Sequence, residues 1–125
     1  MIYNLIKYLL KVTIYSYFRR VSIVGQENIP TEGPVIFVAN HPSALIDPLV
    51  IITGIKRRIH PIAAAEFFGG NFRTWILKNK FHMIPVYRPN LHKDSSKTGN
   101  SDMFTHCHHL LLNQGALLIF PEGTS

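Results

Sequence analysis

The sequence predicts an α/β fold with a mostly parallel sheet flanked by helices. Short apolar runs alternate with helix-forming segments along the 125 residues, as they do in βαβ units. Hydrophobic residues make up 46% of the chain and charged residues 16%, a balance that fits a folded domain with a modest core and excludes a disordered chain. Three of the apolar runs lead almost directly into a polar residue, namely His41, Arg88 and Glu122.

Residues 1–20 are expected to form an amphipathic helix that anchors the chain at a membrane–water interface. The segment is dominated by Ile, Leu, Val, Tyr and Phe, while Asn4, Lys7 and Lys11 recur on one helical stripe. It is shorter and more charged than the run of about 20 apolar residues that crosses a membrane. Tyrosines favour the interface, and lysines extend their amines to the headgroups. An amphipathic helix packed on its own domain is the alternative.

Residues 21–125 are expected to form the domain itself. The continuous apolar run at 35–39 is typical of a strand that is buried on both faces. Turn residues and apolar patterns predict the remaining elements, which are strands at 21–24, 59–65, 81–87 and 116–120 and helices at 48–53, 71–80 and 101–113.

Two helices of this domain can be described in more detail. The helix at 71–80 is expected to turn Trp75, Ile76 and Leu77 inward. Residues 94–100 are polar and typical of an exposed loop, so Ser101 is expected to cap the last helix.

The candidate site lies where the strands end. In open parallel sheets, ligands bind beyond the carboxyl ends of the strands. Since His41, Arg88 and Glu122 each follow a predicted strand, we expect them to converge on one edge of the sheet.

His41 and Asp47 are candidates for a catalytic pair. Six positions on one continuous helix would place them about 240° apart around its axis. Pro48 disfavours helical geometry at Asp47, so Asp47 would be the N-cap and residues 41–46 a compact turn. A carboxylate bonded to Nδ1 leaves Nε2 free to accept a proton. A structural histidine and a capping aspartate are the alternatives, and Ser43 lies too close in the turn for a third member.

Three short segments stand out in order along the chain. They are residues 40–48 (Asn-His-Pro-Ser-Ala-Leu-Ile-Asp-Pro), residues 84–88 (Ile-Pro-Val-Tyr-Arg) and residues 120–125 (Phe-Pro-Glu-Gly-Thr-Ser). They resemble the first, second and third motifs of the glycerol-3-phosphate and lysophosphatidic acid acyltransferase family. Residues 63–68 also resemble a recurrent family segment, although the lysine common there is absent. The first motif departs from the usual spacing, because five residues rather than four separate its His from its Asp; a longer spacing also occurs in branches of the family.

The resemblance implies an enzyme that moves a fatty acyl group to a hydroxyl of glycerol-3-phosphate or lysophosphatidic acid in phospholipid biosynthesis. His41 would be the general base assisted by Asp47, with no cofactor other than acyl-CoA or acyl-ACP as co-substrate. Arg88 offers a planar fork of donors that suits the acceptor's phosphate, although it could equally be an ordinary surface arginine. Glu122 would accept a hydrogen bond from the hydroxyl or hold Arg88, and Gly123 would present its N–H to an anion, unless their segment is merely a tight turn.

Further expectations concern how much of the enzyme this chain contains and where the protein is located. Because the family has a further motif beyond the third, the chain is expected to be an N-terminal part of a longer enzyme that need not be active alone. Cys107 is the single cysteine, which excludes an internal disulfide and favours a reducing compartment. Together with the N-terminal helix, this predicts a membrane-associated protein on the cytoplasmic face. A catalytically inactive membrane-binding module of the same fold is the alternative function.

The charge of the chain predicts an anionic partner. A net charge of +6 and a pI near 9.7 would suit an anionic lipid surface, a phosphorylated substrate or nucleic acid. Nucleic acid is disfavoured, because aromatic residues do not interleave with basic ones and no nucleic-acid motif is present. No metal site is expected either, because His106 and His109 share a helical face at a spacing that matches no standard zinc pattern.

Overall fold

The structure, a computed structural model, describes residues 1–40, 46–87 and 96–121, and it confirms the predicted α/β fold. Four parallel strands form one sheet in the order β1-β4-β2-β3. The strands are β1 (Val35–Val38), β2 (Ile59–Ala64), β3 (Ile84–Val86) and β4 (Ala116–Ile119). The helices are α1 (Ile2–Tyr17), α2 (Ile46–Gly54), α3 (Asn71–Asn79) and α4 (Ser96–Leu112), with short 3-10 turns η1 (Gln26–Asn28) and η2 (Ala65–Phe68).

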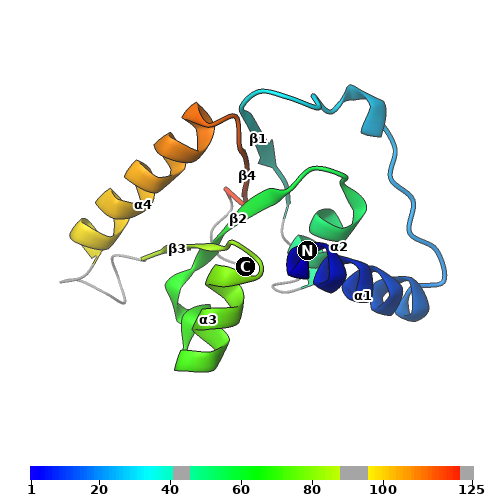
Figure 1. The fold of residues 1–125 in the computed structure, drawn as a ribbon, viewed down its shortest axis with the longest axis horizontal. Coiled ribbons are helices and arrows are strands. Elements are labelled where there is room, and N and C mark those ends of the chain that lie inside the picture. Colours follow the sequence, from blue (N-terminus) through cyan, green and yellow to red (C-terminus); the bar gives the residue numbers. More distant parts are fainter. Residues whose placement is uncertain (41–45, 88–95, 122–125) are drawn as a thin grey trace.

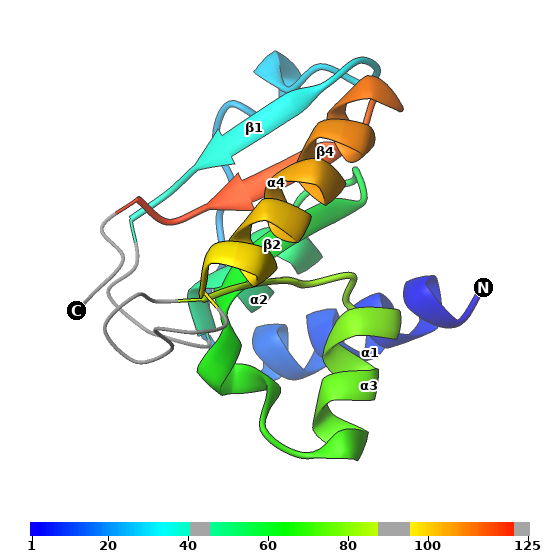
Figure 2. The same ribbon diagram turned by 90° about the vertical axis from the view of Figure 1, so that its left-hand side faces the viewer.

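Helices cover the two faces of this sheet. Helix α4 lies on one side of the strands, and α1 and α2 lie together on the other (Figures 1 and 2). Under α4, a cluster of Ile84, Met103, Cys107 and Leu117 forms the apolar core. Helix α1 packs on α2, and its buried residues include Tyr3. No helix in the described part of the chain is both long and apolar enough to cross a membrane.

Strand β4 is the centre of the sheet. It pairs with β1 on one side and with β2 on the other. Its residues Ala116, Leu117 and Leu118 are all buried, and Leu118 is completely inaccessible to solvent. The sequence predicted this buried strand because a continuous apolar run is typical of a strand that is covered on both faces.

Arg57 holds together the loops at the edge of the sheet where the strands begin. Its guanidinium donates hydrogen bonds to the carbonyl oxygens of Pro30 (2.8 Å), Gly33 (2.7 Å) and Gln114 (2.9 Å). These carbonyls belong to the segment before β1 and to the turn before β4, so one side chain ties together the entries into three neighbouring strands. Hydrogen bonds to a charged donor contribute about 1.5–3 kcal/mol each to stability.

Two expectations about strands were wrong. Strand β1 is not buried on both faces, because it lies at the edge of the sheet, and Ile36 and Val38 are 52% and 64% exposed. Residues 21–24 form no strand, and the Ile23 side chain instead packs against Gly54 at the end of α2. Both errors have the same cause. An apolar run indicates burial or β propensity, but whether a segment pairs, and whether it lies at the edge or the centre, depends on the whole sheet.

Two expectations about helices were also wrong. Trp75 is not turned inward: it is 49% exposed, stacks with Phe72 and lies under the ammonium group of Lys80. Helix α4 already includes residues 96–100, so these do not form a loop and Ser101 is inside the helix rather than its cap. Polar residues are common in loops, but here tertiary contacts described below hold them in helical geometry.

We expect Leu118→Ala to destabilise the chain by about 3 kcal/mol, because truncating a buried leucine loses its transfer free energy and leaves a cavity. Urea unfolding followed by circular dichroism measures this change. The matched control is Leu112→Ala on α4, where the leucine is 65% exposed and little change is expected. Equal effects of the two substitutions would contradict a central position for β4.

Candidate active site

The carboxyl ends of the strands form one edge of the sheet, and the backbone register shows which residues are level there. Val38 of β1 pairs with Ile119 of β4. Pro61 of β2 pairs with Leu118, so Ile62 is level with Ile119, and Ile62 in turn pairs with Ile84 of β3. One row therefore runs across all four strands.

The three polar residues predicted from sequence follow this row at nearly equal intervals. His41 comes three residues after Val38, Glu122 three after Ile119, and Arg88 four after Ile84. These residues and Gly123 lie outside the described residues. The structure thus brings the strand ends that precede His41, Arg88 and Glu122 to a single edge.

Of the five site residues predicted from sequence, Asp47 is the one that lies within the described residues. It lies half-buried in the first turn of α2, next to the buried Pro48, where a carboxylate interacts favourably with the helix dipole. The expectation that Asp47 is the N-cap was wrong, because Ile46 and Asp47 are already helical. Proline is well tolerated in a first turn, so Pro48 does not force the helix to begin after it. The meeting of His41 with Asp47 stays a prediction.

Asn100 of α4 holds the residue that precedes Arg88. Its side-chain oxygen accepts a hydrogen bond from the backbone N–H of Tyr87, and its side-chain nitrogen donates one to the Tyr87 carbonyl, both at 2.9 Å. The amide thus binds Tyr87 as a neighbouring strand would, at the point where β3 ends. Sequence reasoning missed this contact because it assigned Asn100 to a loop.

Gly99 explains why this part of α4 can lie so close to Tyr87. A Cβ atom at position 99 would come within 2.5 Å of the Tyr87 ring, so only glycine permits this packing. Gly99 and Asn100 are poor helix formers, and they are helical here because both contact Tyr87. Helix α4 therefore holds Tyr87, the residue that follows β3 and precedes Arg88, in place.

A pocket of about 530 Å³ lies between α4 and strands β2 and β3, and it extends from Tyr87, just after β3, to the amino ends of both strands. His60 and His82 line it with ring centroids 5.5 Å apart, and His60 Nδ1 lies 3.2 Å from the carbonyl oxygen of Ala116. Burial lowers the pKa of both imidazoles, which favours their neutral forms. This pair could not be predicted from the sequence, because the two histidines are distant in the chain and only the β2–β3 pairing brings them together.

The remaining histidines of the described chain lie on the surface. His106, His108 and His109 are exposed on α4, while Cys107 faces the core with its sulfur 3.7 Å from that of Met103. Within residues 1–40, 46–87 and 96–121, no group of three or more His, Cys, Asp or Glu side chains could hold a metal ion.

Comparison with known proteins identifies the domain. Neither the curated proteins nor the solved structures that were searched include a match. A family model described as Acyltransferase matches residues 20–125, which is most of the chain and includes all four strands. Such a family implies an acyl donor and an acceptor substrate. The chain belongs to the acyltransferase family.

Proposed function

We propose that the protein transfers a fatty acyl group from acyl-CoA or acyl-ACP to a hydroxyl of glycerol-3-phosphate or lysophosphatidic acid, as a step of phospholipid biosynthesis. The observation that carries this proposal is the common edge at which β1, β3 and β4 end, because the chain continues from these three strands to His41, Arg88 and Glu122. The family match supports acyl transfer in general. The narrower proposal, that the acceptor is a phosphorylated glycerol, is supported by the resemblance of the three motifs.

In the proposed reaction His41 is the general base and Asp47 orients it. Nε2 of His41 takes the proton of the acceptor hydroxyl while the oxygen attacks the carbonyl carbon of the thioester. The carbon–sulfur bond then breaks, and the thiolate leaves with the proton that His41 returns. Ester and free thiol are the products, so no acyl-enzyme intermediate is required. General base catalysis contributes about 10²–10⁴-fold to the rate, and positioning adds to it.

Arg88 is proposed to bind the phosphate of the acceptor. A guanidinium pairs two N–H donors with two phosphate oxygens, which also orients the substrate. The hydrogen bonds from Asn100 to Tyr87 support this role, because they fix the backbone immediately before Arg88. Glu122 would accept a hydrogen bond from the acceptor hydroxyl or hold Arg88, and the Gly123 N–H would face an anionic oxygen.

Helix α1 is proposed to rest in the cytoplasmic face of a membrane. Its outer face carries exposed apolar residues at spacings of three and four, namely Ile2, Leu5, Leu9 and Val12. Tyr8 and Tyr15 are also exposed and suit the headgroup level. An interfacial helix would bury these side chains in lipid and keep the domain near its lipid substrate. The cytoplasmic side is favoured by the free thiol of Cys107.

His41→Ala is expected to lower kcat by at least about 10²-fold, because it removes the general base. Release of free CoA from acyl-CoA, with glycerol-3-phosphate or lysophosphatidic acid as acceptor, measures turnover. His109→Ala on the exposed face of α4 is the matched control and should leave kcat unchanged. Turnover retained in folded His41→Ala would exclude the base role, whereas vesicle binding without turnover in the unaltered chain would favour the inactive membrane-binding module.

Arg88→Ala is expected to raise the KM for the phosphorylated acceptor by about tenfold or more, since a charge-assisted hydrogen bond is worth about 1.5–3 kcal/mol. The KM for acyl-CoA should change little, which makes it the internal control. Asn100→Ala should raise the same acceptor KM to a smaller extent, because it only loosens the backbone before Arg88. An acceptor KM unchanged in Arg88→Ala would refute the phosphate contact.

The double substitution Leu5→Asn/Leu9→Asn is expected to weaken binding to lipid vesicles by about tenfold or more, because burying one leucine contributes about 1.5–3 kcal/mol. Co-sedimentation with phospholipid vesicles measures the partition. Leu112→Asn, at a leucine of α4 that is at least as exposed, is the control and should bind as the unaltered chain does. If the control loses as much binding as the double variant, α1 is not the membrane contact.

A further inference from the structure

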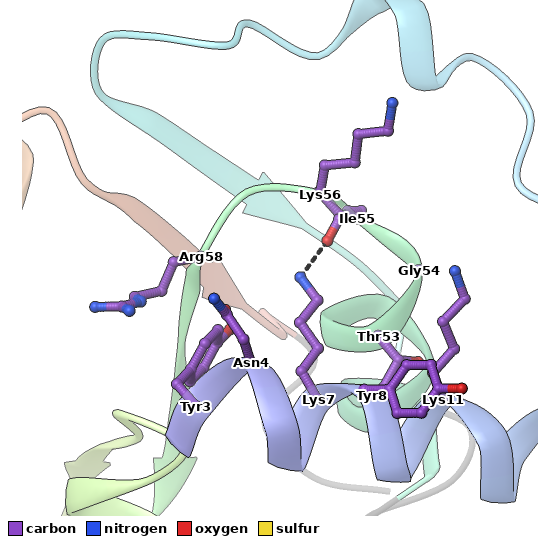
Figure 3. A pocket seen from close by; sticks show the side chains of 10 residues that line it. All are labelled: Tyr3, Asn4, Lys7, Tyr8, Lys11, Thr53, Gly54, Ile55, Lys56 and Arg58. Atoms are coloured by element: carbon purple, nitrogen blue, oxygen red, sulfur yellow. Dashed lines mark hydrogen bonds between the residues drawn. The ribbon is translucent and has the colours of Figure 1, made fainter. Parts of the chain in front are cut away.

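A second pocket, of about 430 Å³, lies between α1 and the segment that joins α2 to β2 (Figure 3). Its size is within the range of about 300–1,000 Å³ that is usual for small-molecule sites. The segment 53–58 leads into the amino end of β2, so the pocket is at the opposite edge of the sheet from the three motifs. It is therefore separate from the candidate active site.

The lining of this pocket is strongly cationic. Lys7 and Lys11 border it from α1, and Lys56 and Arg58 from the α2–β2 segment. In Figure 3 the side chains of Lys56 and Arg58 extend away from each other, with Lys7 between them. None of the ten lining residues, all within the described part of the chain, is acidic, so four basic residues border one hollow without a carboxylate.

Lys7 is at the middle of this group and is held by the backbone. Its ammonium donates a hydrogen bond to the Ile55 carbonyl at 2.5 Å and lies 3.4 Å from the Arg57 carbonyl. Burial lowers the pKa of Lys7, and the neighbouring charge of Lys11 lowers it further. The carbonyl of Gly54 is also taken, by the side chain of Gln26 at 2.6 Å. These two carbonyl oxygens at the carboxyl end of α2, which would otherwise repel an anion, are thus already hydrogen-bonded.

The other three basic residues are accessible to a ligand, because Lys11, Lys56 and Arg58 are all exposed. The guanidinium of Arg58 lies over the Tyr3 ring at 4.7 Å, and the ammonium group of Lys11 lies over the Tyr15 ring at 5.6 Å. The neutral side chains of Asn4 and Tyr8 complete the same wall. A bound anion would relieve the mutual repulsion of these cations and bring the Lys7 ammonium a counter-charge.

We propose that this pocket binds a phosphate group, as a phosphate ester that lies against Lys7 and toward which the exposed side chains of Lys11, Lys56 and Arg58 turn when it binds. A phosphate offers several oxygens and up to two negative charges, which suits a guanidinium fork and several ammonium groups better than a single carboxylate does. The ester can be a lipid headgroup or a soluble molecule. Tyr8 borders both the pocket and the exposed apolar face of α1, so a phospholipid headgroup could enter while its chains stay beside that face.

Two measurements test the pocket and distinguish the two sources. In the first, the chain is co-sedimented with phosphatidylcholine vesicles that contain phosphatidylglycerol. Lys56→Gln/Arg58→Gln should weaken this binding by about 25-fold, since each basic residue near an anionic surface contributes about fivefold. Lys78→Gln/Lys80→Gln removes the same charge outside this pocket and should cost less than about threefold if binding is specific to it.

In the second measurement, glycerol-3-phosphate or inorganic phosphate is added without lipid, and the amide NMR signals of Gly54 and Ile55 are followed. A saturable shift that is lost in Lys56→Gln/Arg58→Gln identifies a soluble phosphate ester as a ligand. Loss of vesicle binding in that variant without such a shift identifies the lipid headgroup. Either result supports the proposal.

The proposal is overturned if neither phosphate compound shifts the Gly54 and Ile55 signals and the two charge variants lose vesicle binding equally. General attraction between a basic protein and an anionic surface would then explain the binding. The lipid measurement rests on the proposed membrane contact of α1, whereas the phosphate measurement does not. Neither involves acyl transfer, so their failure would leave the proposed reaction untouched.

Discussion

The arrangement of the molecule depends on the pairing of β4 between β1 and β2. This strand is last of the four in the described chain, and yet its buried residues Ala116, Leu117 and Leu118 occupy the centre of the sheet. Because all pairings are parallel, every strand ends at the same edge. Burial of β4 is thus the physical reason that segments more than eighty residues apart in sequence can contribute to one site.

Much of this architecture could be predicted from local sequence. Apolar runs located β1, β2 and β4 to within one residue, because short buried strands have a distinctive composition. The strand order could not be predicted, so the run at 35–39 was wrongly expected to be buried on both faces. Asn100 was missed for a related reason: its composition is that of a loop, and only its distant partner Tyr87 makes it helical. Local sequence patterns do not show which residues that are distant in the chain contact each other.

The two ends of the sheet have different chemistry. At the carboxyl edge the strands lead toward the residues proposed to act in proton transfer and phosphate binding, and Asn100 holds the backbone of Tyr87, which precedes Arg88. At the amino edge Arg57 gathers the incoming loops, and basic side chains of α1 and the α2–β2 segment surround a separate pocket. Helix α1 contributes to this second pocket and also carries the apolar face proposed to meet lipid. A phosphorylated lipid would be recognised by both regions through the same kind of interaction.

The most direct test of the proposed site is a crystal structure of the protein with glycerol-3-phosphate bound, in which the separation of His41 and Asp47 is measured. A catalytic pair requires Nδ1 of His41 to lie about 2.7–3.2 Å from a carboxylate oxygen of Asp47, with the phosphate against the Arg88 guanidinium. Side chains of His41 and Asp47 that point to opposite sides of α2, with Arg88 directed away from the ligand, would contradict a common active site at the carboxyl edge of the sheet.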